Sequence, residues 1–184
     1  MQAICRSNDR IEVGGAIPLG GFYIKEIKMT NKEIEKQYNE LKKKHKLPDF
    51  REIDFEFELS DLEPTNFLIR AVIRRIVERL DFYTTILEGV LQPDASNLFA
   101  IHESRFFDDD EKKLMYDFYK RLMNYNRQSV ELSLGNNEKE ETEFINNFFK
   151  DWKEVKIELV RYIKKMKDSW KSETDVDEDV GYMG

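Results

Sequence analysis

Residues 65–91 carry the broadest apolar surface in the chain. At about 100° per residue, apolar side chains spaced three and four positions apart fall on one side of a helix. These positions are Ile69, Val72, Ile73, Ile76, Leu80, Tyr83, Leu87, Val90 and Leu91. Leu68, Val77 and Ile86 widen the arc to roughly half the circumference, which is more than a surface helix usually carries. The pattern therefore predicts a central helix that is covered by more than one neighbour.

Two further long helices are predicted after the central one. Aspartates 108–110 mark the start of the first, because carboxylates accept the free amides of a helix N-terminus and offset its positive dipole end. The last helix has the cleanest amphipathic stripe, formed by Ile145, Phe148, Trp152, Val155, Leu159, Tyr162, Ile163, Met166 and Trp170. A short turn at Gly135 separates the two helices, so we expect them to be antiparallel neighbours.

Two shorter helices are predicted before the central one. Thr30 and Glu33 have the spacing of a capping box, and apolar residues recur at helical spacing after them. Residues 53–59 alternate between apolar and acidic side chains, so a strand and a helix compete there. We prefer the helix because a lone strand has no partner. Ser60 and Glu63 form another capping signature, which predicts that the central helix starts near residue 61.

The predicted fold is all-α. It is a bundle of three long helices, at about residues 61–91, 109–133 and 138–171, with two shorter N-terminal helices packed on it. Residues 95–107 are a connector with one or two helical turns. At about 1.5 Å per residue, the last helix would be roughly 50 Å long and the central helix roughly 40 Å long. The last turns of the last helix are therefore expected to project beyond the bundle.

The two ends of the chain differ in composition from the middle. Residues 1–28 hold four of the eight glycines, lack a helical period and are predicted to form an irregular leader. Lys25 and Glu26 can be encoded by a ribosome-binding sequence just before Met29, so we hypothesise that the native chain starts at Met29. Residues 29–171 then form a single helical domain, and residues 172–184 form an acidic flexible tail.

Composition narrows the classes of protein to consider. The formal net charge of −7 argues against a surface that grips nucleic acid or an anionic membrane throughout. Cys5 is the single cysteine, so no intrachain disulfide forms and a reducing compartment fits best. No apolar run reaches the roughly 18 residues needed to span a bilayer. We expect a soluble, cytoplasmic protein.

The residue patterns do not predict catalysis. A helical di-metal site needs Glu-x-x-His pairs, but Lys42 precedes His45 and Phe99 precedes His102 at that spacing. No Ser-His-Asp or Cys-His arrangement can be assembled with specificity. We therefore expect a protein that is not an enzyme and that uses neither a metal nor a cofactor.

Four arginines of the central helix leave two interpretations open. They are Arg70, Arg74, Arg75 and Arg79. Because the guanidinium fork suits phosphate and carboxylate equally, they can contact an anion or RNA, or they can pair with carboxylates. Three carboxylates on the same side of the helix favour pairing, namely Glu78, Asp81 and Glu88. The RNA interpretation would make this an RNA- or ribonucleoprotein-associated protein.

Met166 and Trp170 continue the stripe of the last helix past the expected end of its partner. Leaving them in water would forfeit roughly 1.5–3 kcal/mol of burial each. The expected cover is the N-terminal helix, a second copy of the chain or another protein. Because tryptophan is enriched at binding hot spots, we expect an interaction or adaptor protein that binds a protein partner through the last helix and the tail.

Three segments resemble small, uncharacterised archaeal helical proteins. They are residues 46–63, 86–94 and 165–170, and the similarity extends over residues 30–171. The resemblance implies a cytoplasmic housekeeping or accessory protein and brings no named activity.

The leader hypothesis predicts that residues 1–28 contribute little to stability. A chain that begins at Met29 should unfold in a thermal melt at nearly the same temperature as the full chain. A large drop in melting temperature would refute the hypothesis.

Overall fold

The computed structural model describes the backbone of residues 20–171 and the side chains of residues 32–171. Its helices in chain order are α1 (Gly20–His45), α2 (Phe50–Phe57), the 3₁₀ helix η1 (Leu59–Asp61), α3 (Leu68–Leu91), α4 (Leu98–Arg105), α5 (Asp109–Leu134) and α6 (Glu138–Ser169). Residues 20–171 contain no strand, so the prediction of an all-α fold is confirmed.

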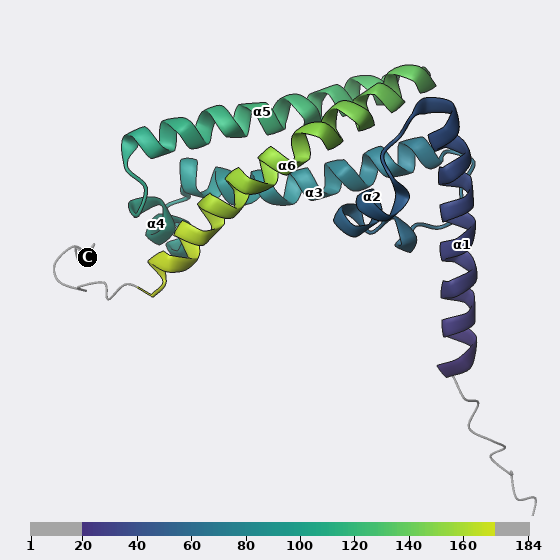
Figure 1. Ribbon diagram of the computed structural model, residues 1–184. Coiled ribbons are helices and arrows are strands. Elements are labelled where there is room, and N and C mark those ends of the chain that lie inside the picture. The colour runs from purple at the N-terminus through teal and green to yellow at the C-terminus, as the bar shows by residue number, and fades with distance from the viewer. Residues whose placement is uncertain (1–19, 172–184) are drawn as a thin grey trace, which may run out of the picture.

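Helix α3 lies at the centre of the molecule and packs against α2, α4, α5 and α6 (Figure 1). Its buried side chains follow the predicted stripe and are Leu68, Ile69, Val72, Ile73, Ile76, Leu80, Thr84, Leu87 and Val90. Helices α5 and α6 form an antiparallel hairpin across α3, joined by residues 135–137 (Figure 1). One hydrophobic cluster connects buried side chains of α1, α2, α3, α5 and α6.

Helix α1 crosses one end of the bundle, and its N-terminal half extends beyond the other helices (Figure 1). Ile34 and Tyr38 are buried, and the Tyr38 hydroxyl donates to the Pro48 carbonyl at 3.3 Å. Burial raises the pKa of Tyr38 above its ordinary value. The helix begins at Gly20 and not at Thr30, because a capping pair permits a helix start without stopping the helix from continuing upstream.

The predicted leader and tail are therefore only partly covered by the structure. Residues 20–28 belong to α1, so the prediction of an irregular leader is wrong for them. Residues 1–19 and the predicted tail at 172–184 lie outside the described residues.

The predicted start of the central helix near residue 61 is also wrong. The Ser60 amide and hydroxyl donate to the Asp54 carboxylate at 2.6 and 2.5 Å, so they secure the end of α2 and do not cap a new helix. Pro64 then disfavours the helical conformation for the residue before it. As a result α3 starts at Leu68.

The predicted connector contains a helix, α4, which closes the end of the bundle opposite α1 (Figure 1). The Asn97 side chain caps it by accepting the Ala100 amide at 3.2 Å. Helix α4 packs against both α3 and α6. A Cβ atom at Gly89 of α3 would lie 3.9 Å from the Ala100 Cβ, so these two backbones come close together.

We expect Phe148→Ala to destabilise the fold by about 3–5 kcal/mol, because its ring is fully buried and a cavity would replace it. The ring contacts Phe57 of α2, Tyr125 of α5 and Trp152 of α6. The matched control is Leu134→Ala on the exposed end of α5, which should change stability by less than about 0.5 kcal/mol. Chemical denaturation measures both, and equal effects would contradict the assigned core.

Candidate functional site

Trp170 lies at the C-terminal cap of α6 and is packed on α4. Its indole ring packs against the His102 ring in a tilted arrangement, with ring centroids 4.3 Å apart and ring planes 36° apart. The indole Nε1 donates to the Glu103 carboxylate at 2.8 Å. The side chain nevertheless remains 49% exposed. Trp170 is therefore held in one orientation while about half of it faces solvent.

Met166 does not share this exposure. Its side chain is 4% exposed and belongs to the core cluster. The expectation that the last turns of α6 project beyond the bundle is wrong, because α4 packs against them. The cover is thus a segment of the same chain that was predicted as a connector. Of the two predicted interface residues, Trp170 alone is accessible.

Other apolar side chains extend the exposed surface around Trp170. The Phe99 ring lies 5.6 Å from the Trp170 ring and is 70% exposed, and Leu98 beside it is 77% exposed. The His102 ring, in turn, lies 5.0 Å from Phe106. We call Leu98, Phe99, His102 and Trp170 the aromatic patch. It is formed by the first turns of α4 and the end of α6.

His102 links the two helices of the aromatic patch. Its Nε2 lies 3.3 Å from the Ser169 carbonyl oxygen, which can only accept, so Nε2 is the donor in this bond. The same imidazole supports the Trp170 ring. The polar contact and the ring contact of His102 together fix the geometry of the patch.

The four predicted arginines are mostly engaged in ion pairs. Arg70 pairs with Glu141 at 2.8 Å, Arg75 with Glu78 at 3.3 Å and Arg79 with Glu58 at 2.9 Å. Arg74 is exposed and forms no ion pair among residues 32–171. The arrangement matches the carboxylate-pairing interpretation more closely than an open stripe of cations.

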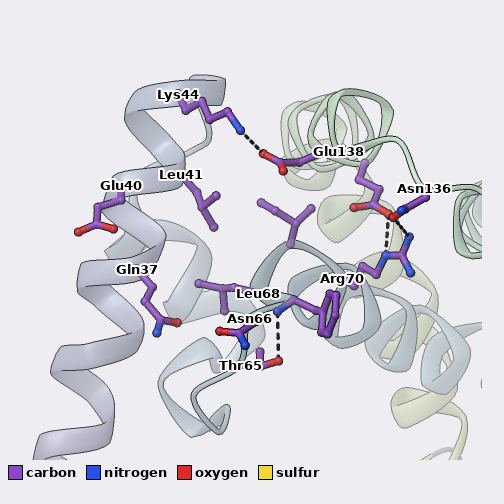
Figure 2. Close-up of a pocket in the computed structure, with 13 residues that line it drawn as sticks. Gln37, Glu40, Leu41, Lys44, Thr65, Asn66, Leu68, Arg70, Asn136 and Glu138 are labelled. Carbon is purple, nitrogen blue, oxygen red and sulfur yellow. Dashed lines mark hydrogen bonds and ion pairs between the residues drawn. The ribbon is translucent and has the colours of Figure 1, made fainter.

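Arg70 lies at the edge of a cleft of 680 Å³ between α1, the start of α3 and the α5–α6 turn (Figure 2). Besides Glu141, its guanidinium donates to the Gly135 carbonyl at 2.9 Å and to the Asn136 side chain at 3.0 Å. Leu41 and Leu68 form the apolar floor between the two helices (Figure 2). The Gln37 side-chain oxygen is buried without a hydrogen-bond partner in the described part of the chain.

The opposite side of this cleft is closed by Glu138 at the first turn of α6. Lys44 donates to its carboxylate at 2.7 Å (Figure 2), and His45 Nε2 lies 2.5 Å from the same oxygen. The hydrogen bond from Lys44, followed by that from His45, lowers the pKa of Glu138. Because the cationic groups around the cleft already hold carboxylates, the cleft offers an anionic ligand little free charge.

Among the side chains of residues 32–171, no group of three or more His, Cys, Asp and Glu gathers around a point that could hold a metal ion. No helix in that range is both long and apolar enough to cross a bilayer. Cys5 lies outside the described residues.

No protein-family model, curated protein or solved structure that was compared with this chain matches it. The resemblance to archaeal helical proteins therefore stays a prediction.

The aromatic patch was only half visible in the sequence. Trp170 is predicted from the α6 stripe that it continues, whereas the sequence pattern places Leu98, Phe99 and His102 in a connector. The available signal was the apolar pair Leu98–Phe99 directly after Asn97, a preferred N-cap residue. That signal predicts a short helix with an apolar first turn, but not the helix against which it packs.

Removing Arg70 should destabilise the protein, because the Glu141 side chain is 7% exposed and would lose its ionic partner. We expect Arg70→Ala to cost roughly 1–3 kcal/mol. The matched control, Arg74→Ala, removes an unpaired surface arginine from the same helix and should cost less than about 0.5 kcal/mol. Urea denaturation compares the two, and equal losses would show that the Arg70–Glu141 pair has no structural role.

Proposed function

We propose that this protein is a non-catalytic interaction module of the cytoplasm that binds a protein partner through the aromatic patch. The observation that supports the proposal most directly is Trp170, half exposed and already fixed by Glu103 and His102. Tryptophan is the residue type most enriched at binding hot spots, where it fills a pocket on the partner.

The fixed geometry of the patch lowers the cost of binding. A large side chain that is ordered only on association loses about 0.5–1.5 kcal/mol of conformational freedom. Trp170 has already lost much of that freedom in its packing against His102. The two exposed neighbours, Leu98 and Phe99, add apolar surface beside the indole. The patch therefore suits a partner with an apolar pocket.

The proposal assigns the contact to the aromatic patch and not to residues 172–184, which lie outside the described residues. The alternative of an RNA-associated protein has less support. An RNA phosphate would have to displace Glu141, Glu78 and Glu58 from the arginines that they hold.

Self-association is tested first, because a second copy of the chain is one candidate partner. Sedimentation velocity over a range of protein concentrations reports whether the wild-type chain forms dimers. If it does, Trp170→Ala should raise the dimer dissociation constant by about tenfold or more, the effect expected for a hot-spot residue.

If the wild-type chain is monomeric, affinity capture from the native host with quantitative mass spectrometry identifies the partner. We expect the Trp170→Ala variant to capture at least about 90% less of the partner than wild type does, which corresponds to a tenfold weaker affinity. The matched control is Phe67→Ala, which removes another exposed aromatic, at the α1 end of the bundle, that is 69% exposed against 49% for Trp170. If the Trp170→Ala variant has a lower melting temperature but captures the same proteins as wild type, the patch has a structural role only and the proposal fails.

A further inference from the structure

A second apolar surface lies on α6, away from the aromatic patch. A groove of 730 Å³ runs between α2 and the middle of α6, and its lining includes Phe55, Phe149, Trp152 and Ile157. Phe55 is 82% exposed and Ile157 is 64% exposed. Val160, one turn further along α6, is also exposed. Exposed apolar side chains this close together mark a surface that another segment covers.

One edge of the groove is polar and is organised by hydrogen bonds within the fold. Glu56 of α2 accepts the Trp152 indole N–H at 3.0 Å and the Lys156 ammonium at 2.5 Å. Burial alone would raise the pKa of Glu56, but the hydrogen bonds from Lys156 and Trp152 outweigh it and lower that pKa. The Glu56 carboxylate is thus ionised and used within the fold. Arg51, Glu52 and Lys153 also line the groove and form no ion pair among residues 32–171, so they remain available to an occupant.

The same face of α6 becomes strongly cationic toward the C-terminus. At about 100° per residue, one side of the helix between residues 149 and 169 carries apolar residues and lysines but no acidic residue of α6. Its lysines are Lys153, Lys156, Lys164 and Lys167, and Lys171 follows just past the end of the helix. Lys156 pairs with Glu56 and Lys171 with Asp168. Among residues 32–171, the other three form no ion pair.

The residues that follow Lys171 have the opposite charge. Residues 172–184 contain five carboxylates, at Glu173, Asp175, Asp177, Glu178 and Asp179, and no cation. Val176, Val180 and Tyr182 are interspersed with them. The segment follows Lys171, which lies two residues beyond the end of α6 at Ser169. Its charge and its apolar residues complement those of the surface beside it.

The length of the segment also fits. Ile157 lies 14 residues before Lys171, which is about 21 Å along a helix. Thirteen extended residues span up to about 43 Å, enough to turn back and reach the groove at Phe55. The separation from Lys171 to Phe149 is about 33 Å on the same rule, so the whole surface is within reach.

We propose that residues 172–184 fold back along α6, with their carboxylates on Lys164, Lys167 and Lys153 and their apolar side chains in the groove beside Phe55 and Ile157. This inference goes beyond the proposed function, since it concerns a different surface and an intramolecular occupant. Its consequence is that the tail covers the apolar groove and neutralises the unpaired lysines of α6.

Paramagnetic relaxation measured by NMR tests the contact in the full chain. Cys5→Ser removes the single native cysteine, and Gly181→Cys then places one spin label in the tail. We expect the label to broaden the methyl signals of Ile157 and Val160 and to leave those of Val130 and Leu134 on α5 sharp. No broadening at Ile157 and Val160 would overturn the proposal.

Charge reversal supplies the matched comparison. In the labelled chain, Lys164→Glu with Lys167→Glu should abolish the broadening, because two cations that hold the tail become repulsive. Lys112→Glu with Lys113→Glu makes the same charge change on α5 and should leave the broadening intact. Circular dichroism checks that both variants remain folded. Equal effects of the two pairs would overturn the electrostatic assignment.

A final mixing experiment separates this chain's own tail from that of a second copy. Chains that carry the spin label but no isotope enrichment are mixed with isotope-enriched chains that carry no spin label. Broadening within one chain and none in the mixture supports the intramolecular contact. Equal broadening in the mixture would show that a second copy occupies the groove and would overturn the proposal as stated. Trp170→Ala should not change any of these signals, so failure here is distinguishable from failure of the aromatic patch.

Discussion

The need to cover α3 on several sides determines the rest of the structure. Its apolar arc spans roughly half the helix circumference, and one neighbouring helix cannot cover so wide a surface. Helices α5 and α6 cover it along most of its length, α2 packs beside them, and α4 packs near its C-terminal end at Gly89. Because α4 is needed at the C-terminal end of α3, it is also brought against the last turns of α6. The aromatic patch is a consequence of that coverage.

Local sequence signals predicted α5 and α6 well, because both have a periodic stripe and a strong N-terminal boundary. Asp108 and Glu111 form a reciprocal capping box at the start of α5, and Asn137 caps α6 through the Lys139 amide. The start of α3 was mispredicted because its signal was ambiguous. The hydroxyl of Ser60 can cap a following helix or bond to a preceding one, and the choice depends on the position of Asp54 in the folded chain.

The candidate site was less predictable than the fold, since it depends on contacts between distant segments. The periodicity of α6 identified Met166 and Trp170 together, yet one is buried and the other half exposed. The difference arises from the position of α4, whose Glu103 accepts the Trp170 indole N–H although it lies 67 residues earlier in the chain. No local pattern carries that information. Ion pairing of the arginines was predictable in kind but not in partner: only Arg75 pairs with a carboxylate of its own helix, whereas Arg70 and Arg79 pair with Glu141 and Glu58 of other segments.

The packing of the other helices depends on α3. Native-state hydrogen exchange measures this most directly, because it reports the free energy of the opening that exposes each amide. We expect the buried middle of α3, around Ile76 and Leu80, to exchange only through global unfolding and to be protected at least as strongly as any part of α5 or α6. Faster exchange in α3 than in α5 and α6, through a local opening that leaves those two helices protected, would contradict it.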